Sequence, residues 1–113
     1  MEVYLAEITQ ARSGDKGNIS DISLFANNRQ LYEILKKEIT SEKVKKHFQG
    51  LCQGEVERFE VPNVMALKFV LHEALGGGAP SSLRMDNLGK SMSAALLRMK
   101  IDIPNDLFEE IIN

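Results

Sequence analysis

The chain has 113 residues, 43% of them hydrophobic and 27% charged, which predicts one compact domain, residues 1–113, with its own core. Its net charge of -2 lacks the basic excess of most nucleic-acid-binding surfaces, so we expect no nucleic-acid partner. A single cysteine, no signal peptide at the start and no apolar stretch of the roughly 20 residues that span a bilayer predict a cytoplasmic protein that does not bind membranes.

Strand and helix patterns follow one another in the first half of the chain. Apolar residues alternate with others over 3–10 and 21–26, which indicates two strands, and the glycine-containing segment 11–18 between them is predicted to be a loop. Asn28 is placed to cap a helix with an apolar stripe from Leu31 to Ile39. Ser41 is predicted to cap a second short helix.

The second half of the chain also contains both strand-like alternation and helical apolar stripes. Strands are expected in three segments: 55–61, with Phe59 and Val61 on the side opposite Arg58 and Glu60, then 83–86 and 99–103. Helices are expected in three others: 62–75, which ends at a run of glycines, 91–97 and 105–112. The last of these is too short to be stable alone, so it must pack on its own domain or on a partner.

Several of these strands have one apolar and one polar side, as in an antiparallel sheet that packs helices on one face. We therefore predict an α+β fold. Its expected architecture is a two-layer, ferredoxin-like sandwich with a mostly antiparallel sheet and helices on one face.

The segment 11–18 carries the strongest local signal, because two cations, an anion, a hydroxyl and two glycines follow one another there: Ala11, Arg12, Ser13, Gly14, Asp15, Lys16, Gly17 and Asn18. Glycines permit positive φ angles, at which successive backbone N–H groups can converge into an anion-binding concavity. Arg12 would then bind a carboxylate or phosphate through its planar fork, and Lys16 would add a point charge. The alternative is a polar turn solvated by water.

Three ordered stretches resemble motifs of the AtuA-like ferredoxin-fold domain family: 11–18; Phe69-Val70-Leu71-His72-Glu73-Ala74-Leu75-Gly76-Gly77-Gly78; and Ser82-Leu83-Arg84-Met85-Asp86 with Gly89-Lys90. The resemblance covers nearly the whole chain. It implies a domain that occurs fused behind a larger acyclic-terpene-utilisation region or as a separate small protein. It also implies a link to the catabolism of acyclic terpenoids through acyl-CoA intermediates. The first motif departs from the family pattern after Asn18, because Ile19-Ser20-Asp21 follow directly where the resemblance implies an acidic residue and a second asparagine nearby.

The candidate site residues come from these motifs. The expected ligand-binding or anion-binding set is Arg12, Ser13, Gly14, Lys16, Gly17, Asn18, Gly76, Gly77, Gly78, Ser82, Arg84 and Asp86. Asp15 and His72 are the candidates for moving a proton, although an isolated histidine is more often structural. His47 and His72 share no ligand spacing with Cys52 or with a carboxylate, so we predict no metal site and no cofactor.

Three functions are compatible with these features. We favour an accessory or binding subunit that works with a larger AtuA-like protein and completes a site that neither chain forms alone. A small self-sufficient enzyme acting on a CoA thioester or carboxylate, with Arg12 and Lys16 holding the anion, is the alternative. A structural homo-oligomer that uses the exposed face of the sheet is the second alternative. Whether the chain is itself catalytic stays open at this level.

Overall fold

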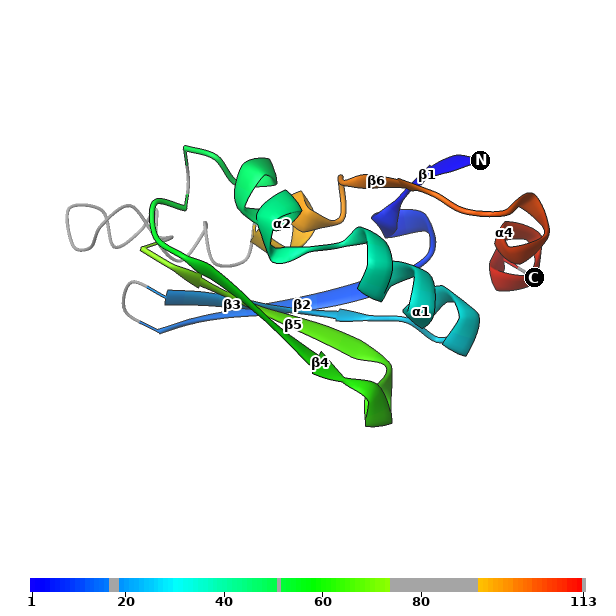
Figure 1. Cartoon of the computed structure of the whole chain (residues 1–113), viewed down its shortest axis with the longest axis horizontal. Coiled ribbons are helices and arrows are strands. Elements are labelled where there is room, and N and C mark those ends of the chain that lie inside the picture. The colour runs from blue at the N-terminus through cyan, green and yellow to red at the C-terminus, as the bar shows by residue number, and fades with distance from the viewer. Residues whose placement is uncertain (17–18, 51, 74–91, 113) are drawn as a thin grey trace.

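The computed structural model describes residues 1–16, 19–50, 52–73 and 92–112, with the backbone alone at 15 and 16. Its centre is an antiparallel sheet in the order β2-β3-β5-β4 (Figure 1), formed by β2 (Gln10–Lys16), β3 (Ile19–Phe25), β5 (Ala66–His72) and β4 (Val56–Val61). A second, two-stranded sheet pairs β1 (Glu2–Tyr4) with β6 (Lys100–Asp102). The helices are α1 (Arg29–Glu38), α2 (Ser41–His47), residues 92–96 and α4 (Asn105–Ile112).

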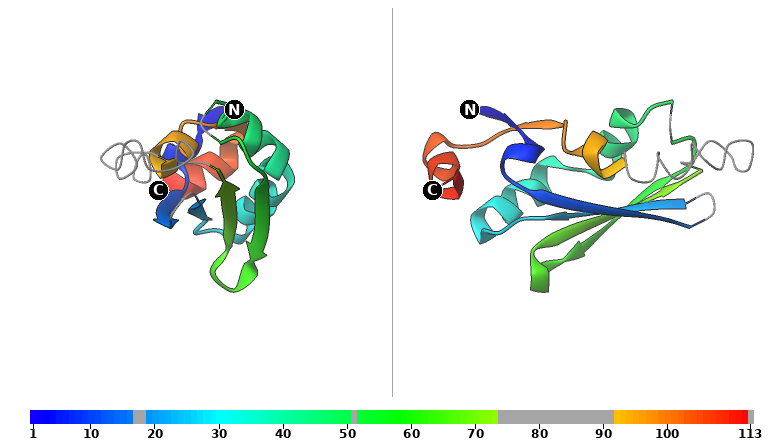
Figure 2. Two further views of the ribbon diagram at one scale, coloured as in Figure 1. Left: turned by 90° about the vertical axis from the view of Figure 1, so that its left-hand side faces the viewer. Right: turned by 180° about the vertical axis from the view of Figure 1, so that it is seen from behind.

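The elements form two layers. Helices α1 and α2 and the β1–β6 pair lie together above the four-stranded sheet, whose opposite face is left open by the described elements (Figures 1 and 2). This arrangement confirms the predicted α+β, ferredoxin-like sandwich with a mostly antiparallel sheet and helices on one face. None of the described helices has the length and apolar character needed to cross a membrane.

The core lies between the two layers, and the period of two in the central strands builds it. Every second residue of β3 and β5 points toward the helices and is buried, which includes Ile22, Leu24, Leu67, Phe69 and Leu71. Helix α1 contributes Leu31, Tyr32 and Leu35, which are fully buried. The terminal helix α4 buries Leu107 and packs Phe108 and Ile111 against the same core, so this segment docks on its own fold.

Local capping signals fix the two main helices. The Asn28 side chain accepts a hydrogen bond from the Leu31 N–H at 3.1 Å, which confirms the predicted cap of α1. The cap of α2 was predicted one residue too late, because the Thr40 hydroxyl, rather than Ser41, accepts from the Lys43 N–H at 3.1 Å. The strand over 55–61 and the sequence of helix then strand from 92 to 102 also agree with the predictions.

The predicted single strand over 3–10 is wrong for most of its length, because only residues 3–4, in β1, and residue 10, in β2, belong to strands. The chain leaves β1 for a 3-10 turn, η1 (Leu5–Glu7), and only then enters β2. The turn buries both Leu5 and Ile8, three residues apart, which a straight strand would place on opposite faces. The Glu7 carboxylate accepts from the Tyr4 N–H at 2.9 Å and stabilises this turn.

The predicted loop over 11–18 is also wrong for most of its length, because residues 11–16 are the body of β2 and pair residue by residue with β3. Gly14 serves this pairing rather than a turn. A Cβ atom at position 14 would lie 2.9 Å from Oδ1 of Asp21, its cross-strand partner. The glycine therefore makes room for a neighbouring carboxylate on the strand.

The predicted helix over 62–75 is replaced by a 3-10 turn, η2 (Pro62–Val64), followed by strand β5. The spacing of Leu67 and Leu71 is four residues, which is common to the helical and the strand periods, so it did not distinguish them. Met65 adopts a left-handed conformation with φ 52°, which ends the turn and starts the strand. The predicted strand over 83–86 lies outside the described residues.

Candidate functional site

The sheet brings the first two sequence motifs to the same end. Ile19 on β3 pairs with Lys16 of the first motif on one side and with His72 of the second motif on the other. The Cα atoms of Lys16 and His72 are therefore separated by two strand spacings, about 10 Å. This end of the sheet is the candidate site, as its position gathers residues that are far apart in the chain.

The backbone of the first motif does not form an anion-binding concavity over residues 12–16. In a strand the N–H groups of successive residues point to opposite edges, so they cannot converge on one ligand. Arg12 and Gly14 lie on the open face of the sheet, across from Ser23 and Asp21, whereas Ser13 lies opposite the buried Ile22 on the covered face.

Several expected site residues fall outside this description. The side chains of Asp15 and Lys16 are among them, and so are all atoms of the remaining candidates: Gly17, Asn18, Gly76, Gly77, Gly78, Ser82, Arg84 and Asp86. The roles expected for these residues stay predictions.

Arg12 and His72 lie too far apart to act on one small molecule. Arg12 is in the row that contains Ser23 and Lys68, four residues along the sheet from the row of His72. Four residues and two strand spacings place the two Cα atoms roughly 17 Å apart. A small carboxylate held by Arg12 would therefore be out of reach of the His72 ring.

The imidazole of His72 lies beside a carboxylate from the edge strand β4. Its Nε2 atom is 3.4 Å from Oε1 of Glu57, the diagonal neighbour on the open face, and this ion pair forms when the ring is protonated. Nε2 is shielded from solvent and has no hydrogen-bond partner among the described residues. The sequence pattern assigned His72 to a helix, and on β5 it instead faces the open side of the sheet.

The main-chain carbonyl of His72 accepts hydrogen bonds from the segment that precedes β4. The His72 carbonyl accepts from the Gly54 N–H at 3.0 Å and from the Cys52 thiol at 3.3 Å. A Cβ atom on Gly54 would lie 2.7 Å from that carbonyl oxygen, so this approach requires glycine. Burial raises the pKa of the Cys52 thiol, which therefore stays protonated at neutral pH and acts as a packing group.

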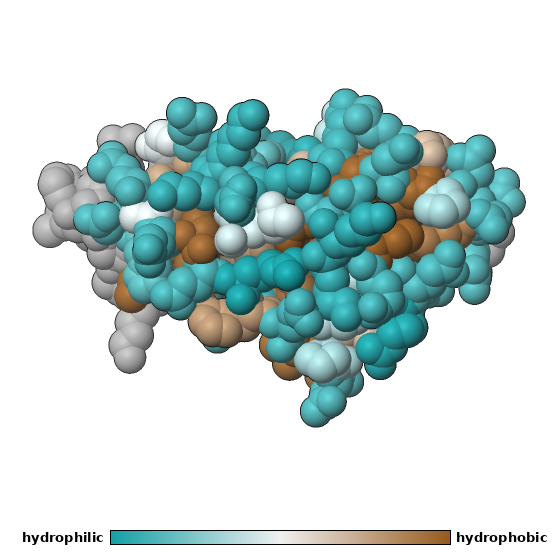
Figure 3. Space-filling view, in the orientation of Figure 1, coloured by the Kyte–Doolittle hydropathy of each residue, from teal (hydrophilic) through white to brown (hydrophobic). Residues whose placement is uncertain are grey.

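The open face combines charged pairs with exposed apolar side chains. Lys68 and Asp21 form an ion pair at 3.7 Å in the middle of the face. Around this pair Ile19, Phe59 and Val61 are 39%, 47% and 38% exposed. In Figure 3 apolar side chains project at the lower edge of the molecule, where the sheet lies.

Strand β4 turns the apolar side chains of its last residues outward and its arginine toward the covered face. Arg58 points toward the covered face, where its guanidinium donates to the carbonyls of Lys36 at 2.7 Å and Ile39 at 3.1 Å at the end of α1. Phe59 and Val61 consequently face outward. A strand that exposes its apolar side and covers its arginine is a local violation of the usual pattern, and such violations are expected where a surface serves a function.

Comparison with known proteins agrees with these features. A model of the AtuA ferredoxin-like domain matches residues 3–102. The chain belongs to the AtuA ferredoxin-like domain family. No curated protein and no solved structure gives a significant match.

Two features of this AtuA ferredoxin-like domain were not found from sequence. Glu57 was missed as the neighbour of His72, since the two residues belong to different strands and only the sheet register places them together. The outward side of β4 was missed because the pattern of Phe59 and Val61 is that of an ordinary buried face. Within the described ranges, no three His, Cys, Asp or Glu side chains are grouped so as to hold a metal ion.

Proposed function

We propose that this AtuA ferredoxin-like domain is an accessory binding module that docks on a larger AtuA-like protein through the open face of its four-stranded sheet. The observation that carries the proposal is the outward side of β4, where Phe59 and Val61 are exposed while Arg58 is used to hold α1. Exposed apolar patches surrounded by charged groups are typical of protein–protein interfaces.

The dimensions of the face fit a reversible interface. Four strands of about seven residues cover roughly 19 by 24 Å, a projected area of about 450 Å². Stable complexes bury about 800 Å² of accessible surface on each partner, so this face alone supports a small and dissociable interface. The mixed charges of Arg12, Asp21 and Lys68 would set the orientation of the partner more than its affinity.

We further propose that the completed site takes a CoA thioester or a related carboxylate of acyclic terpenoid catabolism, as the family resemblance implies. The distance of roughly 17 Å between Arg12 and His72 favours a long ligand that reaches both ends of the face over a small carboxylate. In this proposal Arg12 binds an anionic group, and His72, beside Glu57, is positioned to accept a proton once the partner closes the site.

The docking proposal is tested by co-purification with a larger AtuA-like protein, followed by size-exclusion chromatography with light scattering. The double variant Phe59→Asp, Val61→Asp should lose co-elution, whereas Ile112→Asp, which changes an even more exposed apolar residue on α4, should retain it. Failure of the wild-type chain to associate, or equal binding by the double variant, would refute the proposal.

Size-exclusion chromatography with light scattering also tests the other candidate occupant of the open face, a second copy of this chain. A chain that is monomeric alone and associates only with the larger protein supports the accessory role. A wild-type dimer that the double variant converts to monomer would instead identify a second copy of this chain as the occupant, in favour of the structural homo-oligomer.

A further inference from the structure

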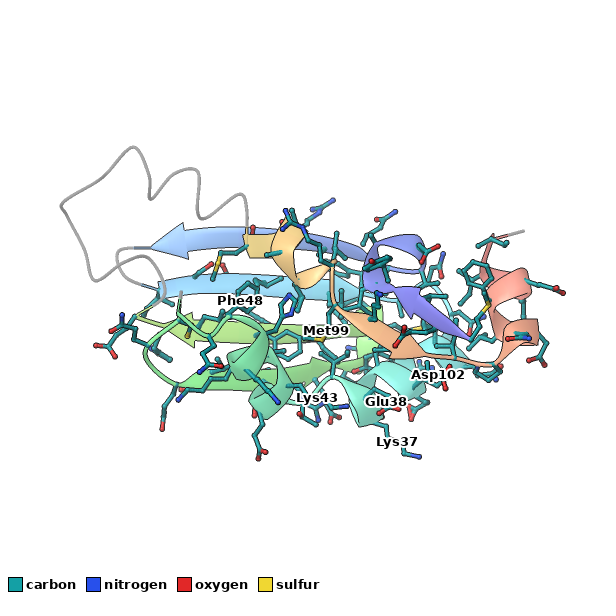
Figure 4. All side chains as sticks on the ribbon, turned by 90° about the horizontal axis from the view of Figure 1, so that it is seen from above. Lys37, Glu38, Lys43, Phe48, Met99 and Asp102 are labelled. Atoms are coloured by element: carbon teal, nitrogen blue, oxygen red, sulfur yellow. The ribbon has the colours of Figure 1, made fainter. Side chains whose placement is uncertain are left out.

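A second surface lies in the other layer of the molecule, well away from the open face. A groove of about 350 Å³ runs between the helices and β6. The end of α1 and helix α2 contribute Ile39, Lys43 and Lys46 to one wall, and the other wall is formed by Met99, Lys100 and Ile101. Figure 4 shows Lys43 and Met99 on either side of this region, with Glu38 beside Lys43.

The second wall of the groove is the free edge of a strand. Lys100 and Ile101 are consecutive residues of β6, and successive side chains of a strand point to opposite faces, so both line one groove only where the edge of the strand faces that groove. Strand β1 covers the other edge, where Leu5 N–H donates to the Met99 carbonyl at 2.8 Å and Ile103 N–H to the Met1 carbonyl at 2.9 Å.

In this register the backbone groups of Lys100 and Asp102 point away from β1. Lys100 is paired with Tyr4, whose N–H donates to the Glu7 carboxylate at 2.9 Å instead of to Lys100. Alternate residues of an antiparallel pair direct both backbone groups outward, and within the described chain no other element bonds to those of Lys100 or Asp102. The edge therefore offers two donors and two acceptors to an added strand.

The charged lining of the groove consists of three lysines, Lys43, Lys46 and Lys100, and one carboxylate, Glu38. The Lys43 ammonium forms an ion pair with the Glu38 carboxylate at 3.6 Å. The Lys100 ammonium lies 4.0 Å from the Glu2 carboxylate and 4.8 Å from the centre of the Tyr4 ring. The ammonium of Lys46 has no ion-pair partner among the residues that the structure places. The apolar part of the groove walls consists of Ile39, Met99 and Ile101, of which Ile39 and Ile101 are buried and Met99 is partly exposed.

We propose that this groove binds an extended acidic peptide segment of another protein, which adds as a strand to β6. The backbone of the segment pairs with Lys100 and Asp102, its acidic side chains contact Lys43, Lys46 and Lys100, and an aliphatic side chain on its other face packs against Met99. A small anion would use the lysines and leave the strand edge unpaired, so the geometry points to a peptide. This inference does not depend on docking at the open face.

The test uses a capped heptapeptide in which glutamate and valine alternate, titrated into the ¹⁵N-labelled full chain and followed by amide chemical shifts. The amides of Lys100 and Asp102 should shift and saturate with a Kd of about 0.1 to 1 mM, in keeping with one short added strand. Lys43→Glu, Lys46→Glu should weaken binding about tenfold or more by reversing the charge of one wall. Lys45→Glu, a single charge reversal on the same helix outside the groove, should bind within about twofold of wild type.

A second peptide separates strand addition from simple attraction of an anion. The same sequence N-methylated at every residue keeps every charge but loses all of its backbone donors, and it should bind at least about fivefold more weakly. Equal binding of the two peptides would overturn the proposal in favour of a small-anion site on the lysines. No saturable shift up to about 5 mM peptide, or shifts confined to the open face of the sheet, would also overturn it.

Discussion

Two glycine-to-alanine substitutions, Gly54→Ala and Gly14→Ala, test whether the sheet end that carries His72 is built as described. In each case a new Cβ atom would come within 3.0 Å of a neighbour, but the neighbours differ in kind. At position 54 they are the carbonyl oxygen, carbonyl carbon and Cβ of His72, at 2.7, 2.9 and 2.9 Å. At position 14 the neighbour is the terminal Oδ1 of Asp21, at 2.9 Å.

The consequences follow from what can move. The Asp21 side chain can rotate away from an alanine at position 14, which breaks an exposed ion pair with Lys68 worth at most about 1 kcal/mol. An alanine at position 54 must displace main chain of β5, and overpacking of this kind costs about 1 to 3 kcal/mol. It also weakens the hydrogen bond from Gly54 N–H to the His72 carbonyl, which adds up to about 1 kcal/mol.

We therefore expect Gly54→Ala to lower the free energy of unfolding by about 1 to 4 kcal/mol, and Gly14→Ala to change it by less than about 1 kcal/mol. With an unfolding entropy of about 0.24 kcal/mol/K for this length, the first change lowers Tm by about 4 to 17 °C. Urea and thermal unfolding followed by circular dichroism measure both variants. Equal losses, or a Gly54→Ala variant as stable as wild type, would refute the packing described for His72.

Three further predictions concern stability. Arg58→Met removes two guanidinium hydrogen bonds to carbonyls at the end of α1 and should lower the free energy of unfolding in urea by about 2 kcal/mol. The control Lys37→Met, in the last turn of α1, should change it by less than about 0.5 kcal/mol, and equal effects of the two variants would contradict the capping role of Arg58. Asn28→Ala removes the bond accepted from Leu31 and should cost about 1 kcal/mol, while Asn28→Ser should restore most of it, and an unchanged Asn28→Ala midpoint would argue against the cap. Because burial raises the pKa of the Cys52 thiol, the unfolded chain releases this proton at lower pH than the folded chain, so the free energy of unfolding should fall as pH rises above about 8.5. Between pH 7 and pH 9.5 the free energy of unfolding should fall less in Cys52→Ala than in wild type, and an identical fall would contradict this prediction.

Helix α1 was predictable because its signals are local. Asn28 caps its first turn, a stripe from Leu31 to Leu35 marks the buried side, and Lys36 and Lys37 stand in its last turn. None of these features depends on a distant part of the chain. The same holds for α4, whose stripe and starting residue are adjacent in the sequence.

Strands β2 and β5 were not predictable from their own residues, because their partners come from elsewhere in the chain. The glycines and charges of the first motif favoured a loop, and pairing with β3 overrides that preference. One signal was available: the dipeptide Gly17-Asn18 is typical of a two-residue hairpin connection, which would have predicted the observed pairing of Lys16 with Ile19.

The candidate site shows the same limit. Arg12 and His72 were identified as important residues, but their separation along the sheet depends on the register of three strands. The partnership of His72 with Glu57 also depends on that register. The outward side of β4 follows from the demand of the α1 carbonyls for Arg58, which no pattern within β4 reveals.

Photo-cross-linking tests the docking face most directly. A benzophenone amino acid at position 59 places the reactive group on the open face, and the same residue at exposed position 109 on α4 serves as the control. In the presence of a larger AtuA-like protein, irradiation should give a covalent adduct with that protein from position 59 and none from position 109. No adduct from position 59, or adducts of equal yield from both positions, would contradict the account.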